Sequence, residues 1–573
     1  MKVFFRFLKE YPRESVLAPL FKLLEACFDL LVPLVVAKII DDGIGGGDRG
    51  LIVRLVIVLC VLALVGLASA LSAQYFAARA ATGSAARLRR ELFAHLQGFT
   101  YAQTDKVGVS AMITRLTSDV NQLQSGVNMT LRLFLRSPII VIGSVILAFT
   151  IDVPSAWIFA VTVPVLAAVV FGIILGGIPL YKRVQAKLDG VTAATRENLN
   201  GTRVIRAFCK EDEEIADFRR ISREHSLLQN AAGRLSALMN PLTYLLLNLA
   251  TIALIWLGGA QVDEGALTRG ELVALVNYMT QILVELVKLA DTIFLVTKAM
   301  ACGNRVGAVL DAPVGMAIIP DDGEHDGCAV SFEGVSLTYG DGGEAALSDI
   351  DLKIDTGTTV GIIGGTGSGK TSLVNLIPRF YEASEGSVRV FGKSVSSYTP
   401  DALRERIGIV PQKAVLFCGT VRSNLLWGNE NATDDELWAA LRAAQAEDFV
   451  RSKEGGLDAA VEEGGRNFSG GQRQRLTIAR ALVRRPELLI LDDSSSALDY
   501  VTDAALRGAI KNLDYSPTVL IITQRTASVK GADKIVVLDD GRICGVGKHS
   551  QLLDSCDVYR EIHESQFKGG DAV

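Results

Sequence analysis

The sequence predicts a polytopic α-helical membrane domain followed by an α/β domain. The first observation is that long apolar runs are confined to residues 15–300, although 49% of the whole chain is hydrophobic and its mean hydropathy is +0.32. The second is that short β-rich runs, Gly turns and helical stretches alternate from Val330 onward. Because 573 residues exceed what one hydrophobic core organises, at least two domains are expected.

Six apolar segments of the first part are long enough to cross about 30 Å of hydrocarbon. The links between them alternate in length, and Lys and Arg gather in the two long links, 79–130 and 181–240. The positive-inside rule therefore predicts a multi-pass protein of the cytoplasmic (inner) membrane, with the long links, the second domain and both termini in the cytoplasm. The expected spans are residues 15–40, 51–78, 131–151, 153–180, 241–262 and 270–298.

The two long links are improbable as structureless loops in a compact domain. Leu88, Leu92 and Leu96 recur at helical spacing in the first of them. The pattern predicts that the spanning helices continue into the cytoplasm and reverse at coupling turns near 114–119 and 200–208, which press on the second domain. Plain helical hairpins with no transmitting role are the alternative.

Ionisable residues interrupt the first and the sixth expected span. Charges within a membrane are costly, so they are expected to face the bundle interior or a water-filled cavity. Two interpretations stay open: a translocation path for amphiphilic or cationic cargo, or ion pairs between helices. The residues are Lys22, Glu25 and Asp29 in the first span and Glu285, Lys288 and Asp291 in the sixth.

Residues 364–371 of the second domain fill the template G-x-x-x-x-G-K-[ST]. They follow the apolar run 360–363, which predicts a strand, and precede a run from Ser372 that predicts a helix. Glycines let successive backbone N–H groups converge on phosphate oxygens. Lys370 reaches β- and γ-phosphates in such loops, and the Thr371 hydroxyl binds Mg²⁺. The sequence therefore predicts a site for a nucleoside triphosphate.

Two carboxylates, Asp492 and Asp493, end a second apolar run, 487–491. A strand that delivers Asp492 to the Mg²⁺ side of the phosphate loop is the Walker B arrangement. Residues 468–475 form another Gly turn that opens a helix, which is a second candidate phosphate cradle. One chain needs only one cradle for a γ-phosphate. The simplest arrangement is therefore two nucleotide domains that face each other, each of which contributes its second cradle to the ATP site of the other.

Residues 330–573 resemble the nucleotide-binding domain of ATP-binding cassette (ABC) proteins, and residues 1–305 resemble the membrane half of exporter-type half-transporters, with 306–329 as the linker. The resemblance implies six transmembrane helices, an α/β P-loop ABC nucleotide-binding domain, and ATP and Mg²⁺ as cofactors. It also implies that Glu463, just before the signature motif, contacts the cytoplasmic helices of a partner subunit.

The resemblance assigns roles to individual residues of this chain. The implied ATP-binding residues are Tyr339 against adenine, the Walker A loop Gly364, Gly365, Thr366, Gly367, Ser368, Gly369, Lys370, Thr371 and Ser372, the Q-loop Gln412, and Asp492, of which Thr371, Gln412 and Asp492 lie near Mg²⁺. The residues implied to contact ATP across the dimer interface are Ser469, Gly470, Gly471 and Gln472 of the signature and Asp499 of the D-loop.

Two positions depart from the family pattern, and both belong to the catalytic machinery. Asp493 stands where the family usually has a glutamate that orients water, and Gln524 stands where the switch loop usually has a histidine. Aspartate withdraws the carboxylate by roughly 1.5 Å, and a displacement near 1 Å can cost about 10²-fold in rate. Gln524 is a neutral amide and cannot act as an imidazolium does. The pattern predicts a site that binds ATP and hydrolyses it slowly.

The expected function is ATP-driven export of amphipathic small molecules or drugs, by one half of a heterodimer whose partner half-transporter supplies the Glu and the His. A homodimer with slow ATPase, an importer-like transporter and an ATP-gated regulatory partner are the alternatives. The six spans exclude a soluble nucleic-acid-acting ABC protein, and the net charge of −5 argues against nucleic-acid binding. Membrane lipid and the amphipathic substrate are the other expected partners.

Overall fold

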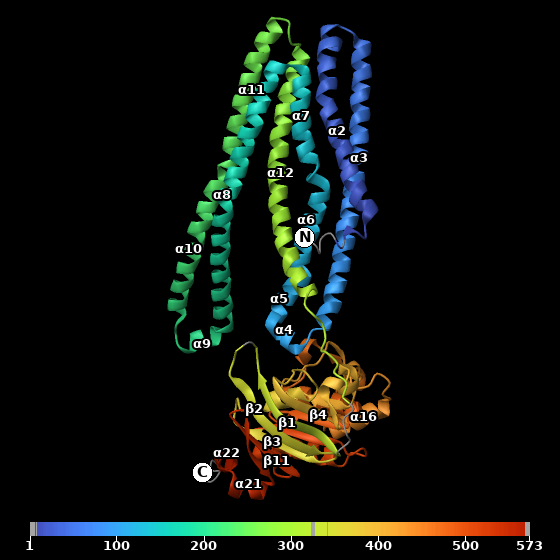
Figure 1. The fold of residues 1–573 in the computed structure, drawn as a ribbon, viewed down its shortest axis with the longest axis vertical. Helices are drawn as coiled ribbons and strands as arrows, with labels where there is room; N and C mark the ends of the chain where they lie inside the picture. The colour runs from blue at the N-terminus through green and yellow to red at the C-terminus, as the bar shows by residue number, and fades with distance from the viewer. Residues whose placement is uncertain (1–5, 7, 322–326, 341, 568–573) are drawn as a thin grey trace. The chain divides into compact units, whose positions relative to one another are not determined.

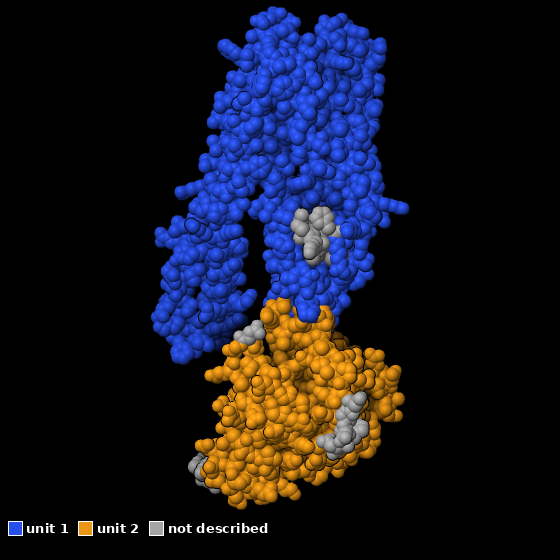
Figure 2. Space-filling view, in the orientation of Figure 1, with its two compact units in different colours: residues 1–97, 109–313 blue, residues 98–108, 314–573 orange. Residues whose placement is uncertain are grey.

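The computed structural model describes residues 6, 8–321, 327–340 and 342–567. The chain forms two compact units, one of residues 1–97 and 109–313 and the other of residues 98–108 and 314–573 (Figure 2). The division after residue 313 falls inside the expected linker 306–329, of which residues 322–326 lie outside the described part.

The first unit is helical, which confirms the predicted fold class (Figure 1). By length and composition, five helical segments of the described residues are able to cross a membrane: residues 49–97, 109–151, 153–200, 211–263 and 269–310. The first expected span corresponds to α2 (Pro12–Lys38), which is less apolar because it carries Lys22, Glu25 and Asp29. The helices are α2, α3 (Arg49–Gln97), α5 (Val109–Thr114), α6 (Val120–Leu133), α7 (Arg136–Ile151), α8 (Val153–Asn200), α9 (Thr202–Ala207), α10 (Glu211–Ala237), α11 (Met239–Asp263) and α12 (Arg269–Leu310), with π-helical turns η1 (Ile39–Gly45) and η2 (Arg115–Asp119).

The long links are helical extensions of the apolar spans. The second of them reverses through α9, between Gly201 and Phe208, where the sequence predicts a turn (Figure 1). The first expected turn, at 114–119, is wrong, because these residues lie in one helical run from 109 to 151. Asp119 is buried there and forms an ion pair with Arg305 of α12 at 2.6 Å, which holds this segment against the bundle.

The chain reverses instead at residues 98–108, which belong to the second unit. Thr100 caps the short helix α4 (Tyr101–Val107), and Gly108 ends it with φ of 78°, a value that favours glycine. The ring of Tyr101 stacks on Phe380 with centroids 4.3 Å apart. The Tyr381 hydroxyl donates a hydrogen bond to Asp105 at 2.5 Å. Segment 98–108 is therefore packed into the second unit by aromatic and polar contacts.

The second unit is built on two main sheets. One has the order β2-β1-β4-β5 and is antiparallel, and the other has the order β12-β11-β3-β10-β9-β6 and is parallel except for β12. β3, β9 and β10 are almost entirely buried, as their unbroken apolar runs predict. The strands are β1 (Cys328–Thr338), β2 (Ala345–Asp355), β3 (Thr359–Gly364), β4 (Glu385–Val390), β5 (Lys393–Ser394), β6 (Ile407–Val410), β9 (Leu488–Asp492), β10 (Thr518–Thr523), β11 (Lys534–Asp539) and β12 (Arg542–Gly547).

The parallel register brings three functional segments to one edge of the sheet. β10 lies between β3 and β9, with Ile522 opposite both Ile362 and Asp492. The carboxyl ends of these strands continue into residues 364–371, Asp493 and Gln524. Ligands of open parallel sheets bind at this edge, so the topology positions a site here.

Candidate functional site

The loop after β3 is shaped by glycines and closed by a lysine. Gly367 and Gly369 have φ of 82° and 90°, and a Cβ on Gly364 would lie 2.1 Å from the Leu538 carbonyl oxygen. The Lys370 ammonium donates to the Gly364 and Gly365 carbonyl oxygens at 2.9 and 2.5 Å and to the Ser368 hydroxyl at 3.2 Å. Burial lowers the pKa of Lys370. The loop therefore presents a partly desolvated cation on a backbone that only glycine permits.

A cavity of about 230 Å³ opens beside this loop. Asp492 and Asp493 enter it from the end of β9, Gln412 from the segment after β6, and Gln524 from the segment after β10. The structure thus brings together residues that the sequence places up to 178 positions apart, from Ala346 to Gln524. The cavity is lined by Ala346, Thr366, Gly367, Ser368, Gly369, Lys370, Thr371, Ser372, Gln412, Asp492, Asp493, Ile522 and Gln524.

The two carboxylates of the cavity have different partners. Asp492 accepts a hydrogen bond from the Thr371 hydroxyl at 3.3 Å, and Asp493 accepts one from the Gln412 amide at 3.4 Å. Burial raises the pKa of both Asp492 and Asp493 above the ordinary carboxyl value. Because both groups sit close to Lys370, the site combines a buried cation with two carboxylates that are poorly solvated.

Tyr339 lies next to the loop rather than in the cavity lining. Its hydroxyl donates to the Ser372 hydroxyl oxygen at 3.0 Å, and its ring meets Tyr381 edge to face at a centroid distance of 5.0 Å. The side chain is exposed, so its ring is accessible to a flat apolar group. A nucleobase is such a group, and aromatic stacking on it is favourable.

Comparison with known proteins identifies both parts of the chain. Residues 15–286 match the ABC transporter transmembrane region, and residues 347–496 match the ABC transporter family. An uncharacterized ABC transporter ATP-binding protein of Mycobacterium tuberculosis is 37% identical over 566 residues, covering 98% of this chain and 97% of that protein. The chain belongs to the ABC transporter family.

Two further similarities refine the fold of this ABC transporter. An ATP-dependent lipid A-core flippase of Hahella chejuensis is 32% identical over 527 residues, covering 90% of this chain and 88% of the flippase. The structure of a bacterial Atm1-family ABC exporter with ATP bound superimposes with a TM-score of 0.80 at 23% identity, covering 97% of this chain and 98% of the exporter. The chain is a multi-pass transport ATPase with the exporter-type fold.

The signature segment of the ABC transporter forms a separate surface and does not line the cavity. Ser469 caps α18 (Gly470–Val483), since its hydroxyl accepts from the Gln472 N–H while the Gln472 side chain accepts from the Ser469 N–H. Asp499 caps α19 (Tyr500–Lys511), since its carboxylate accepts from the Thr502 N–H at 3.1 Å. Ser469, Gly470 and Asp499 are exposed, and so is Glu463 in the turn before the signature.

Sequence reasoning missed two side chains that hold the switch segment. Arg525 follows Gln524 and donates to the carbonyl oxygens of Ser495, Ser496 and Leu498, which ties the switch to the D-loop. Gln566, in α22 (Asp557–Phe567), donates to the Gln524 carbonyl oxygen at 2.6 Å and accepts from the Thr526 N–H and hydroxyl. Arg525 could have been predicted to hold the switch segment, because it directly follows Gln524 in the sequence. No local sequence pattern marks Gln566.

A hollow of about 280 Å³ lies on the nucleotide-binding unit between β6, the segment 417–428 and α18. Phe417 and Trp427 stack at its edge with ring centroids 4.2 Å apart, and both are exposed. Arg480 also lines it, and its Nη1 is buried without a hydrogen-bond partner in the described residues. An incoming segment with apolar side chains and a free acceptor would complement this surface.

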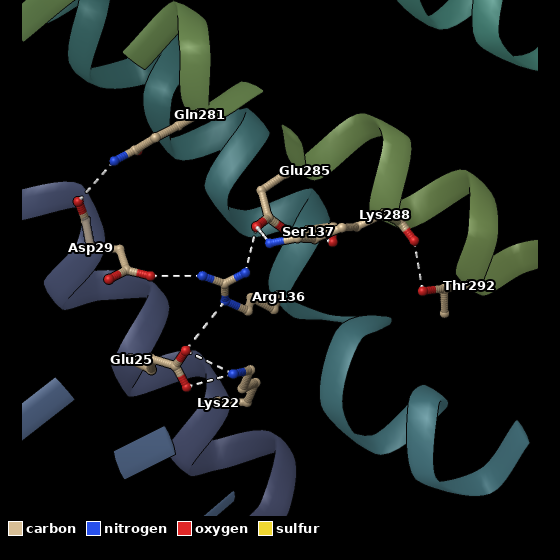
Figure 3. A network of polar contacts seen from close by, with 9 residues as sticks. All are labelled: Lys22, Glu25, Asp29, Arg136, Ser137, Gln281, Glu285, Lys288 and Thr292. Carbon is tan, nitrogen blue, oxygen red and sulfur yellow. Dashed lines mark hydrogen bonds and ion pairs between the residues drawn. The ribbon is translucent and has the colours of Figure 1, made fainter. Parts of the chain in front are cut away.

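The charges inside the first and sixth spans form one network with Arg136 of α7, which the sequence analysis did not single out (Figure 3). Arg136 forms ion pairs with Glu285 and, at 2.7 Å, with Asp29, and Glu25 lies 3.8 Å from its Nε. Three further contacts complete the network: Lys22 to Glu25 at 2.6 Å, Lys288 to Glu285 at 3.1 Å, and the Ser137 hydroxyl to Glu285 at 2.8 Å. Glu25, Asp29 and Glu285 therefore form ion pairs between helices, as one of the two interpretations expects, while Asp291 has no contact in this network.

Proposed function

We propose that this chain is one half of a heterodimeric ABC exporter and carries the hydrolysis-poor ATP site. The observation that supports it most strongly is the cavity itself, in which a complete phosphate loop faces Asp493 and Gln524 in place of the family's Glu and His. The loop that contains Lys370 binds the triphosphate. Asp493 is too short and Gln524 is uncharged, so neither orients the attacking water well. ATP binding then acts mainly as a ligand that favours the closed state.

The cavity residues fit Mg²⁺. The Thr371 hydroxyl, the Asp492 carboxylate and the Gln412 amide carry oxygen ligands of the kind that Mg²⁺ prefers, and Thr371 and Asp492 already share a hydrogen bond of 3.3 Å. When bound, Mg²⁺ would neutralise charge on the β- and γ-phosphate oxygens. In our proposal Asp492 and Thr371 hold the ion, and Tyr339 stacks on the adenine.

The partner in this proposal is a second half-transporter. The exposed signature, from Ser469 to Gln472, and Asp499 complete the partner's ATP site, while the partner's signature covers this chain's own site. The hollow around Trp427 suits an apolar cytoplasmic turn of the partner, of the kind that α9 and the exposed Phe208 form in this chain. Homodimerisation would use the same surfaces, so the choice between the two rests on Asp493 and Gln524.

Export of an amphipathic small molecule is the transport reaction that we propose. The flippase relative moves lipid A-core according to its name, and the fold is that of an Atm1-family exporter. The distribution of Lys and Arg supports a cytoplasmic location for the nucleotide-binding unit and both termini. Export predicts that inside-out vesicles take up the substrate when ATP is supplied.

The ATPase activity of the chain expressed alone, reconstituted in nanodiscs, tests the proposal. The expected result is slow hydrolysis that rises when a partner with Glu and His at the matching positions is coexpressed. Lys370→Ala should remove ATP binding at this chain's site and serve as the control. Brisk ATPase of the chain alone that Asp493→Asn abolishes would refute the proposal.

A further inference from the structure

A cavity of about 360 Å³ lies between α2, α7 and α12, beside the ion network of Figure 3. Its size falls in the range of about 300–1,000 Å³ that small-molecule sites occupy. The wall combines apolar side chains from all three helices, such as Val32, Ile140 and Val284, with polar and charged ones. The polar and charged lining residues are Asp29, Arg136, Asn277, Thr280, Gln281 and Glu285. A wall that is partly apolar and partly charged suits an amphipathic molecule.

Asp29 is the carboxylate of the network with the fewest partners. Glu25 faces both Lys22 and Arg136, and Glu285 faces both Arg136 and Lys288. Among the described residues, Asp29 pairs only with Arg136, through one carboxylate oxygen at 2.7 Å. Its side chain is 40% exposed, against 4% for Glu285. The three cations of the network match its three carboxylates in number, so Asp29 is distinguished by its exposure and by a second carboxylate oxygen that has no partner in the described part of the chain.

A second acceptor lies close to Asp29. The Gln281 amide nitrogen donates to the Asp29 backbone oxygen at 3.4 Å, and the Gln281 Oε1 is buried without a hydrogen-bond partner in the described part of the chain. A buried acceptor without a donor is costly, so this oxygen favours a ligand that supplies an N–H or a cation. Arg136 also lines the cavity, and its Nε is buried without a hydrogen-bond partner in the described residues. It attracts an anion less than Asp29 attracts a cation, because three carboxylates already surround it and only 11% of its side chain is exposed.

We propose that this cavity binds a cationic amphipath, whose positive group pairs with Asp29 near the Gln281 carbonyl oxygen and whose apolar part lies against Val32, Ile140 and Val284. The proposal rests on the proposed transport function and specifies the substrate class of the same protein. Asp29 selects for positive charge, and the apolar wall replaces the lipid around the apolar part of the ligand, so that this part stays out of water when the ligand leaves the membrane.

Tetraphenylphosphonium and tetraphenylborate, which share a shape and differ in charge, test the proposal. Binding to the full-length protein, with its partner subunit if one is required, is measured by equilibrium dialysis in nanodiscs of zwitterionic lipid without nucleotide. The wild type should bind the phosphonium more tightly than the borate. Asp29→Asn should weaken phosphonium binding by about tenfold or more, as expected when a charged partner is lost, and leave borate binding unchanged or stronger.

Asp291→Asn is the matched control, because Asp291 lies on α12 outside both the cavity lining and the ion network. It should bind both probes as the wild type does, and Asp29→Glu should recover most of the phosphonium binding. A wild type that prefers the borate, or an Asp29→Asn variant that binds the phosphonium normally, would overturn the proposal. The wild-type comparison needs no variant and therefore holds even if Asp29→Asn misfolds. Since no step uses ATP, these results are independent of the heterodimer and ATPase tests.

Discussion

The backbone of Asp493 is fixed on both sides of the residue. Its φ is +45°, in the left-handed region that Asp tolerates better than most residues. Its N–H donates to the Ile522 carbonyl oxygen at 2.9 Å, and its own carbonyl oxygen accepts from the Ser496 hydroxyl at 2.8 Å. The length of the side chain therefore decides where the carboxylate lies, while the backbone cannot move to compensate.

The double variant Asp493→Glu/Gln524→His should restore hydrolysis at this chain's site. We expect single-turnover ATP hydrolysis there to rise by about 10²-fold, because a carboxylate displaced by about 1 Å and a missing imidazole are both corrected. The measurement uses an assembly whose partner site is blocked by a substitution of its own Walker lysine. Asp493→Glu alone should gain less, since the switch loop remains neutral. An unchanged rate in the double variant would contradict the assignment of these two residues.

The buried Asp492 should make the nucleotide-free protein less stable as the pH rises. Its pKa is raised in the folded state, mainly by burial, so the folded protein binds more protons than the unfolded chain between the ordinary carboxyl pKa and the raised one. The stabilising contribution is complete below the ordinary value and is lost as the pH rises through the raised one. Asp492→Asn should therefore raise the Tm at neutral pH and lose that advantage near pH 4. Thermal unfolding without ATP and Mg²⁺ checks this, and equal Tm differences at both pH values would contradict it.

At the scale of elements, two short helices of the second unit contact the segments around the ATP site. α22 holds the switch segment through Gln566 and through His563, which lies 3.2 Å from the Thr526 hydroxyl. α4 lies against Phe380 and Tyr381, and Tyr381 in turn meets the ring of Tyr339. Substitutions in either helix should therefore alter ATP retention or the coupling of ATP hydrolysis to transport, while the phosphate loop stays intact.

Gln566→Ala should shorten the time for which this chain retains ATP. The substitution removes hydrogen bonds to the backbone of Gln524 and to Thr526, each worth about 1 kcal/mol, so a retention half-life several-fold shorter is expected. Rapid desalting followed by nucleotide counting measures the half-life. Ser565→Ala is the control, since within the described residues the Ser565 hydroxyl bonds only to the Ile562 carbonyl oxygen of its own helix. Equal half-lives for both variants would show that α22 does not position the switch segment.

Tyr381→Phe should uncouple transport from ATP hydrolysis. The ring contacts with Tyr101 and Tyr339 persist, but the hydrogen bond to Asp105 is lost, and burial raises the pKa of Tyr381 so that the wild-type phenol stays a donor. We expect unchanged ATP affinity and a several-fold lower ratio of substrate transported to ATP hydrolysed in proteoliposomes. Tyr398→Phe removes a hydroxyl from the same unit without touching α4 and should leave the ratio unchanged. A normal ratio in Tyr381→Phe would contradict a coupling role.

At the scale of the whole molecule, features that a contiguous stretch of sequence encodes were predicted better than features that depend on contacts between distant residues. The phosphate loop was predictable because its spacing is local, and the spans because each is a single apolar run. The first turn was misplaced, since helical periodicity does not reveal that the Thr100 cap and Gly108 reverse the chain before residue 114. Arg136 and Gln566 were missed for a common reason: their partners lie on elements remote in sequence, and only the packed helices bring them together.

The fate of ATP at the two sites of one assembly tests the central claim most directly. The purified transporter is loaded with photoreactive 8-azido-ATP carrying a γ-phosphate label, passed through one turnover, desalted and cross-linked. We expect the label to stay on this chain near Tyr339 as intact triphosphate, and to be lost from the partner site as phosphate. Equal hydrolysis at both sites, with two identical copies of this chain in the assembly, would contradict it.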